Sequence, residues 1–282
     1  MTDSKSLKSI DLASTTIMGT SINLIWSVIF TILVIIALSS IFGNFVLSFA
    51  IVGIGIIFAT LVFSISECFG ISHLYNFFIK KMKNVNLNIQ DSDSITGIST
   101  ISLGLIVGVI SLVISIIIYP LIFLLLSFAP IVFGLLQALS LQGFSWIVFP
   151  ASFVITPFFI IYAFIFAFIL TTIGAFIFNK ISPLIGGLKV SLTSEGNLTK
   201  VDSIDPKSAG IVTSIICLVF GLLYGLLFSF VSGNLPANLI LIVELTIGGL
   251  IGGFIYGALS SVLYNFFAKK FNPVKIELED SE

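Results

Sequence analysis

Six long apolar stretches constrain this chain more than any other feature of its sequence. They cover about residues 17–41, 46–78, 101–126, 146–178, 209–231 and 239–267. Each exceeds the ~18 residues that a helix needs to cross about 30 Å of hydrocarbon. Lipid offers no partner to unpaired backbone groups, so each stretch is expected to be helical. With 57% hydrophobic and only 9% charged residues, the chain is not a soluble domain.

An aromatic residue followed by asparagine recurs at the end of each pair of stretches. The three copies are Tyr75-Asn76, Phe178-Asn179 and Tyr264-Asn265. In each copy the aromatic residue precedes an alternating apolar run by ten positions. A spacing kept three times indicates an internal triplication. We therefore predict three helical hairpins as repeats, over residues 1–91, 92–200 and 201–282.

The alternating runs that follow the hairpins have the period of β-strands. Their apolar residues are Val85, Leu87 and Ile89; Leu188, Val190 and Leu192; and Val274, Ile276 and Leu278. Alternation of this kind predicts half-buried strands, and three strands could pair where one alone would be unstable. The other reading is three separate extended tails on the lipid headgroups. The predicted fold class is an all-α membrane protein with six transmembrane helices as three repeated hairpins, each followed by a short cytoplasmic β-strand.

Each hairpin is expected to begin at a residue that caps its first helix. The predicted caps are Asp11, Thr96 and Asp205, whose side-chain oxygens accept hydrogen bonds from free backbone N–H groups. Repeat two is longer than the others, and the path of residues 120–157 is left open. Between Pro130 and Ser145 the apolar run is too short to cross, which favours an interfacial helix on the far side, next to Trp146.

The lysines predict how the chain lies in the membrane. All twelve basic residues are Lys, and each falls before a first helix or after a second. The turns between the paired helices carry no charge. By the positive-inside rule, both termini and both loops between repeats are cytoplasmic in a multi-pass protein of the cell membrane. The absence of Arg is typical of an AT-rich, prokaryotic genome.

Several classes of chemistry find little support in the sequence. A net charge of −1 argues against nucleic-acid binding. The single histidine, His73, is not accompanied by metal-ligand spacing, and no catalytic constellation can be assembled. Cys68 and Cys217 lie in apolar runs and are read as buried thiols. We expect no cofactor, no metal and no enzymatic activity.

Two carboxylates within apolar runs, Glu67 and Glu244, are candidate functional residues because such groups are costly in lipid. The alternatives are snorkelling toward the interface, a hydrogen-bonded partner, or a pore or proton role. The face of Glu244 continues through Gly248 and Gly252 and is predicted to turn toward neighbouring helices. Small residues four apart allow such close helix packing, either within the chain or in a homodimer.

The capped start, paired helices, aromatic-Asn pair, Gly186-Gly187 and alternating acidic tail together resemble a known family. It is the small transmembrane domain family of unknown function known from actinobacteria, with similar archaeal and bacterial hypothetical membrane proteins. The third repeat resembles it best, through Asp205-Pro206, Tyr264-Asn265 and the tail at 275–280. The resemblance implies no particular activity.

Two functions follow as hypotheses. The favoured one is a non-enzymatic scaffold in the lipid bilayer that binds a cytoplasmic protein partner or forms a homo-oligomer. The alternative is a small-solute transporter or channel that uses Glu67 or Glu244.

Overall fold

The computed structural model describes residues 2–42, 46–91, 93–126, 158–233 and 238–281. The chain divides into two compact units. The first contains Met1–Thr96, Gly186–Ala209 and Ala258–Glu282, and the second contains Gly97–Ile185 and Gly210–Gly257.

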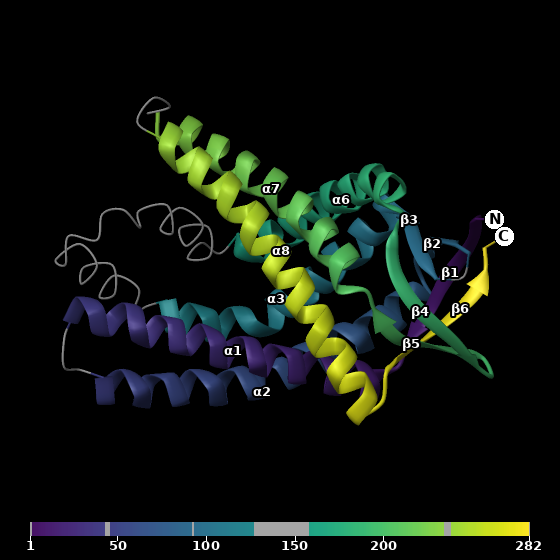
Figure 1. Ribbon diagram of the computed structural model, residues 1–282, viewed down its shortest axis with the longest axis horizontal. Helices are drawn as coiled ribbons and strands as arrows, with labels where there is room; N and C mark the ends of the chain where they lie inside the picture. Colours follow the sequence, from purple (N-terminus) through teal and green to yellow (C-terminus); the bar gives the residue numbers. More distant parts are fainter. Residues whose placement is uncertain (1, 43–45, 92, 127–157, 234–237, 282) are drawn as a thin grey trace. The chain divides into compact units, whose positions relative to one another are not determined.

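Within the described residues, six helices are long and apolar enough to cross a membrane. They are α1 (Leu12–Phe42), α2 (Val46–Ile79), α3 (Thr100–Leu126), α6 (Phe159–Ile185), α7 (Pro206–Val231) and α8 (Leu239–Lys270) (Figure 1). Helix α1 packs along α2, and α3 packs along α6. The prediction of six spanning helices is confirmed. The predicted interfacial helix at Pro130–Ser145 and the predicted start at Trp146 lie outside the described residues.

Six strands close into a barrel. The predicted all-α fold class did not include such a barrel. They are β1 (Thr2–Ile10), β2 (Val85–Gln90), β3 (Ser94–Ile98), β4 (Leu188–Glu195), β5 (Leu198–Ile204) and β6 (Val274–Asp280). The strands follow one another in chain order around the barrel, and β6 pairs antiparallel with β1 to close it (Figure 1). Closure leaves no strand with a free edge.

Strands β2, β4 and β6 coincide with the alternating runs of the sequence, and the other three strands carry no such signal. These three are β1, β3 and β5, each of which runs directly into the first helix of a hairpin. Strand β1 escapes a search for alternation because its polar residues outnumber Leu7 and Ile10. It is held instead by pairing on both sides, with β2 and with β6. Pairing with these neighbouring strands stabilises the extended conformation of β1, which its own side chains do not favour.

The barrel is filled most completely from β2. Val85, Leu87 and Ile89 are buried, with exposed fractions of 1%, 9% and 6%. The side chains between them are more accessible, so β2 has one inner and one outer face. Strand β6 is different, because its residues from Val274 to Leu278 are all half-buried.

The glycine pair at the end of α6 allows the chain to turn into β4. Gly186 and Gly187 have φ angles of +81° and +83°, a region that side chains with a Cβ rarely adopt. A Cβ on Gly187 would also lie 2.9 Å from the Cβ of Ser94 in β3. Both the turn and the close approach of two strands therefore require glycine here.

Candidate functional site: strand–helix junctions and a barrel cleft

The asparagine of each aromatic-Asn pair makes the same two hydrogen bonds. Both bonds go to the backbone of the last residue of the strand that precedes the hairpin. The asparagine Oδ1 accepts from the N–H of that residue, and the Nδ2 donates to its C=O. Asn76 binds Ile10 in this way at 2.8 and 2.8 Å, Asn179 binds Ile98 at 2.7 and 2.8 Å, and Asn265 binds Ile204 at 2.8 and 2.8 Å. A carboxamide is suited to this task because it carries one acceptor and one donor group side by side. Each asparagine thus joins the end of the second helix of its hairpin to the strand residue that precedes the first helix of the same hairpin.

The tyrosines of the first and third pairs add a further hydrogen bond to the same strands. The Tyr75 hydroxyl donates to the Leu7 carbonyl oxygen at 3.0 Å, and the Tyr264 hydroxyl donates to the carbonyl oxygen of Val201. Tyr264 also accepts from the backbone N–H of Val274 at 3.2 Å. Phe178 has no hydroxyl, so the second copy lacks this contact.

Two of the predicted caps are found at helix starts. A side-chain oxygen of Asp11 accepts from the Ser14 N–H, and one of Asp205 accepts from the Ser208 N–H, each at 2.8 Å. The capped turns are also tied to the barrel, because Ser14 Oγ accepts from the Lys275 N–H at 3.1 Å. Ser208 Oγ accepts from the N–H of Lys189 at the same distance.

The prediction of Thr96 as a cap is wrong. Thr96 lies within β3, and its hydroxyl donates to the Asn88 carbonyl oxygen at 3.3 Å. Helix α3 begins only at Thr100, and the Leu103 N–H donates to the Ser99 carbonyl oxygen at 3.1 Å. Ser99 follows Ile98 as Asp11 follows Ile10, so Ser99 occupies the position at which a cap is expected.

A cleft of about 570 Å³ lies beside β4 and β5, at the start of α7. Its wall combines carboxylates, a lysine and the junction asparagine: Asp91, Asp93, Lys189, Val190, Ser191, Leu192, Ser203, Ile204, Asp205, Pro206 and Asn265. Asp91 is held at a φ of +51°, in the turn between β2 and β3. The Asp93 carbonyl oxygen accepts from the Val190 N–H at 2.7 Å, which fixes this turn against β4. Among the side chains that line the cleft, Asp91, Asp93 and Asp205 are acidic and Lys189 is basic.

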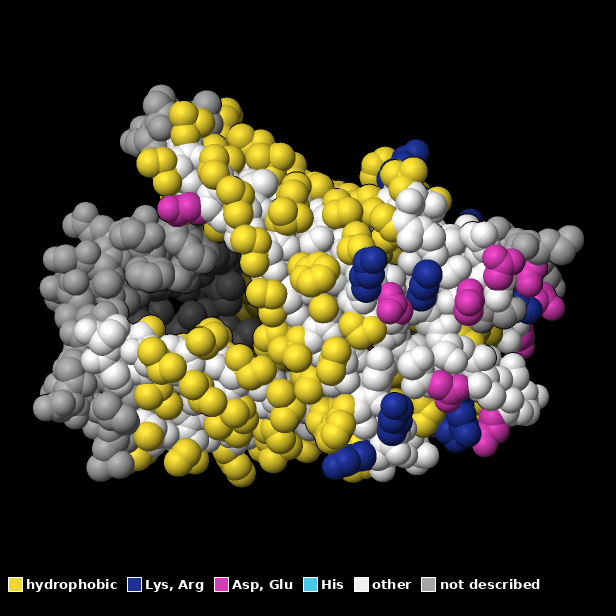
Figure 2. Space-filling model, viewed as in Figure 1, with side chains coloured by type: hydrophobic (Ala, Val, Ile, Leu, Met, Phe, Trp, Pro, Cys, Tyr) yellow, Lys and Arg dark blue, Asp and Glu magenta, His cyan; other side chains and the backbone are white. Residues whose placement is uncertain are grey.

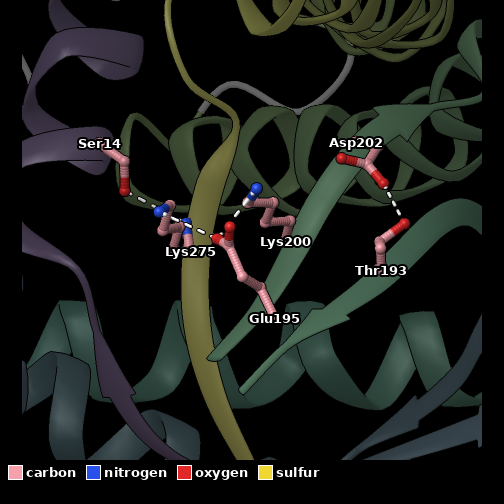
Figure 3. Close-up of polar contacts among 6 residues, drawn as sticks. All are labelled: Ser14, Thr193, Glu195, Lys200, Asp202 and Lys275. Atoms are coloured by element: carbon pink, nitrogen blue, oxygen red, sulfur yellow. Dashed lines mark hydrogen bonds and ion pairs between the residues drawn. The ribbon is translucent and has the colours of Figure 1, made fainter. Parts of the chain in front are cut away.

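Charged side chains also connect the strands on the surface of the barrel. Glu195, at the β4–β5 hairpin, accepts from Lys200 at 2.9 Å and from Lys275 of β6 at 3.2 Å (Figure 3). Hydrogen bonding to Lys200, then to Lys275, holds the pKa of the Glu195 carboxyl below its ordinary value. Because Glu195 is solvated, this pair of contacts is weak but links the hairpin to the closing strand.

Figure 2 shows where charge gathers on one face of the molecule. Lysine, aspartate and glutamate side chains collect over the strands and the helix ends that join them, while hydrophobic side chains cover the helices. Lys81 and Lys270 illustrate the boundary, since each ammonium group lies over a phenylalanine ring one turn earlier, at 4.3 and 4.6 Å from the ring centroid. Such cation–π contacts suit the interface between hydrocarbon and water.

The two carboxylates predicted within apolar spans belong to different units of the chain. Glu67 is half-buried in α2 of the first unit, and Glu244 is exposed in α8 of the second. Neither forms an ion pair within the described part of the chain. In the part of the chain that the structure describes, the prediction that the face of Glu244, Gly248 and Gly252 turns toward neighbouring helices is wrong. A Cβ on Gly248 or Gly252 would meet none of the described residues within 4 Å.

The next glycine pair along α8 makes the helix contact instead. A Cβ on Gly249 would lie 2.4 Å from the Cys217 carbonyl oxygen of α7, and one on Gly253 would lie 2.8 Å from the Thr213 carbonyl oxygen. On α7, a Cβ on Gly221 would lie 2.2 Å from the Leu245 carbonyl oxygen. The glycines of these faces let α7 and α8 approach backbone to backbone.

One part of the chain is similar to a known family. Residues 134–194 match a family model described as a transmembrane domain of unknown function, DUF3566. With six helices able to cross a bilayer, this match settles the class of protein. The chain is a multi-pass membrane protein. The matched segment includes Phe178-Asn179 and Gly186-Gly187, so it falls in the second predicted repeat rather than in the third. No curated protein and no solved structure matches the chain.

Sequence reasoning marked the asparagines but missed their partners. Ile10, Ile98 and Ile204 lie 66, 81 and 61 positions earlier in the chain than the asparagines that bind them. One local signal was available, because Ser9-Ile10-Asp11 and Ser203-Ile204-Asp205 are identical. The cleft had no sequence signal, since its walls come from separate segments that are spread along the chain from Asp91 to Asn265.

Proposed function

We propose that this chain is a non-enzymatic scaffold of the cell membrane whose barrel lies in the cytoplasm and binds a protein partner. The single observation that carries the proposal is the barrel itself. Strands from the start, middle and end of the chain close one barrel, and lysine, aspartate and glutamate side chains gather over its strands (Figure 2). A membrane protein that builds such a body from all its hairpins presents a rigid surface to the aqueous phase.

The orientation of the barrel follows from its lysines. Those of the strands, such as Lys5, Lys200 and Lys275, lie on the barrel, and Lys81 and Lys270 lie at the ends of helices that lead into it. Lysines are retained on the cytoplasmic side of membrane proteins. The recurrence of the asparagine contacts supports the further proposal that three repeats, 1–91, 92–200 and 201–282, arose by triplication.

The closed barrel limits how a partner can bind. Every strand is paired on both sides, so a partner cannot add a strand to an edge. Side chains must make the contacts, and the cleft beside β4 and β5 is a concave surface that offers them. Asp91 and Asp93 at its wall favour a partner segment that carries Lys or Arg.

Affinity capture tests this proposal. The tagged full chain is purified in mild detergent beside a variant with Asp91→Asn and Asp93→Asn, which removes two charges and keeps a residue type that tolerates a positive φ at position 91. A control variant, Asp3→Asn with Glu279→Gln, removes two charges outside the cleft. We expect a basic polypeptide to be retained by the unchanged chain and the control, and lost from the cleft variant. Equal retention by all three would contradict docking at the cleft.

A transporter or channel is the alternative, and the exposed carboxylate of Glu244 is the observation that favours it. A carboxylate in a membrane span is costly unless it serves an ion or a partner. In proteoliposomes, a proton or cation flux that Glu244→Gln or Glu67→Gln abolishes would support this alternative. A second copy of the chain against the open Gly248/Gly252 face would give the carboxylate another role.

A further inference from the structure

A second cavity, of about 320 Å³, lies in the first unit where α1 and α2 approach β6. Its lining is mainly apolar: Thr15, Met18, Gly19, Ile22, Cys68, Ile71, Ser72 and Val274. Its volume is within the range of small-molecule sites, at the lower end. Gly19 keeps part of the space open, because a Cβ there would lie 2.6 Å from the Cys68 sulfur.

Two hydroxyl groups in this lining have no hydrogen-bond partner in the described part of the chain. They are Thr15 Oγ1 and Ser72 Oγ, both buried, and the Ser72 residue is only 1% exposed. Some other hydroxyls on the same two helices bond to backbone carbonyls, as Ser66 does to the Val62 oxygen at 3.1 Å. Further hydroxyls of α1 are also buried without a partner among the described residues, but they do not line this cavity: Thr16, Thr20, Thr31 and Ser39. A buried hydroxyl with no acceptor is unfavourable, so an occupant that offers an acceptor would be favoured.

The depth of the cavity identifies the kind of occupant. Helix α1 has 31 residues and α2 has 34, so they are about 46 and 51 Å long, against about 30 Å of hydrocarbon. Their ends therefore extend roughly 8–10 Å into the interface. Thr15 is the fourth residue of α1, and Ser72 is the eighth from the end of α2. Both hydroxyls thus lie near the boundary between headgroups and hydrocarbon, where phospholipids carry their ester carbonyls.

We propose that this cavity binds one acyl chain of a membrane phospholipid, with its ester carbonyl accepting hydrogen bonds from Thr15 and Ser72. The first methylenes of the chain contact Met18, Ile22 and Ile71. An uncharged ester fits better than a free fatty acid, because none of the described residues that line the cavity is charged. A carboxylate would be left there without a counter-ion.

Photocrosslinking of lipid tests this site. The full chain is reconstituted in phosphatidylcholine vesicles that contain a phosphatidylcholine with a diazirine near the carbonyl end of one acyl chain. After irradiation, mass spectrometry should locate the adduct in the segments 15–22 and 68–72. Removal of both hydroxyls, by Thr15→Val with Ser72→Ala, should lower the yield about three- to tenfold, as expected for lost hydrogen bonds. Ser66→Ala is the matched control and should leave the yield unchanged.

Two further arms keep the test decisive if the double variant fails to fold. Ile71 lines the cavity and is 39% exposed, so Ile71→Trp should block the space without overfilling a core and should abolish the adduct. On the unchanged chain, a dialkyl ether probe, which lacks the carbonyl, should crosslink several-fold less than the ester probe. Equal labelling by the two probes, adducts spread evenly along the helices, or stronger labelling by a diazirine fatty acid would each overturn the proposal.

Discussion

Replacing Asn265 by Ala tests the strand–helix junction most sharply. The change removes the hydrogen bonds to both backbone groups of Ile204. At about 1 kcal/mol for each bond, we expect a loss of about 2 kcal/mol in unfolding free energy. If both backbone groups stay shielded from water, the loss should rise to about 4 kcal/mol. Asn265→Asp should cost at least as much, because a carboxylate accepts from the N–H but cannot donate to the C=O.

Unfolding by SDS in mixed micelles, followed by far-ultraviolet circular dichroism, measures this loss. Asn76→Ala and Asn179→Ala should fall in the same range, since their contacts with Ile10 and Ile98 have the same geometry. Asn272→Ala is the control, because Asn272 is exposed in the loop before β6. It should change stability by no more than about 0.5 kcal/mol. If Asn265→Ala is as silent as this control, the junction does not hold the hairpin to the barrel.

Three further predictions concern the barrel and the aromatic pairs. Ile276→Asp, in the half-buried strand β6, should lower stability by about 1–3 kcal/mol in the same SDS titration, while Glu277→Gln should stay within about 0.5 kcal/mol; equal effects would mean that β6 is a loose tail. Because its lysine partners lower the pKa of Glu195 below the ordinary value of a glutamate, its contribution to stability should be complete above the ordinary value and be lost as the pH falls through the lowered one. The loss of thermal midpoint caused by Glu195→Gln should therefore be smaller at acid pH than at neutral pH, and an equal loss at both would contradict the contact. Phe178→Tyr should raise the thermal midpoint if the new hydroxyl reaches β3 as Tyr75 reaches β1, and a lower midpoint would show that the second junction differs.

The helices could be predicted because each is specified by its own residues. A run of 20 or more apolar residues has one stable state in lipid, and the six observed spans are such runs. Half of the barrel could also be anticipated, from the alternation in runs such as Val85 to Ile89. The other strands could not, because Thr2–Ile10 owes its conformation to pairing with segments about 80 and 270 positions away in the chain.

The candidate sites were harder to predict for a related reason. The asparagines were visible as a recurrent feature, yet what they bind depends on how strand and helix ends meet. Thr96 was misplaced because β3 continues past it to Ile98, and a threonine suits either a cap or a strand. The glycines of α8 were identified, but the choice between the Gly248 face and the Gly249 face depends on where α7 lies.

Cysteine accessibility tests the central claim, a six-helix protein with its barrel and both termini in the cytoplasm. Single cysteines are introduced in a background without Cys68 and Cys217, and intact cells are treated with a membrane-impermeant maleimide. Positions between the two helices of each predicted hairpin should label from outside, and positions beside the barrel should label only after permeabilisation. The first group is Asn44, Gln142 and Asn234, and the second is Lys81, Lys200 and Lys270. External labelling at Lys200, which lies in β5 of the barrel, would contradict the account.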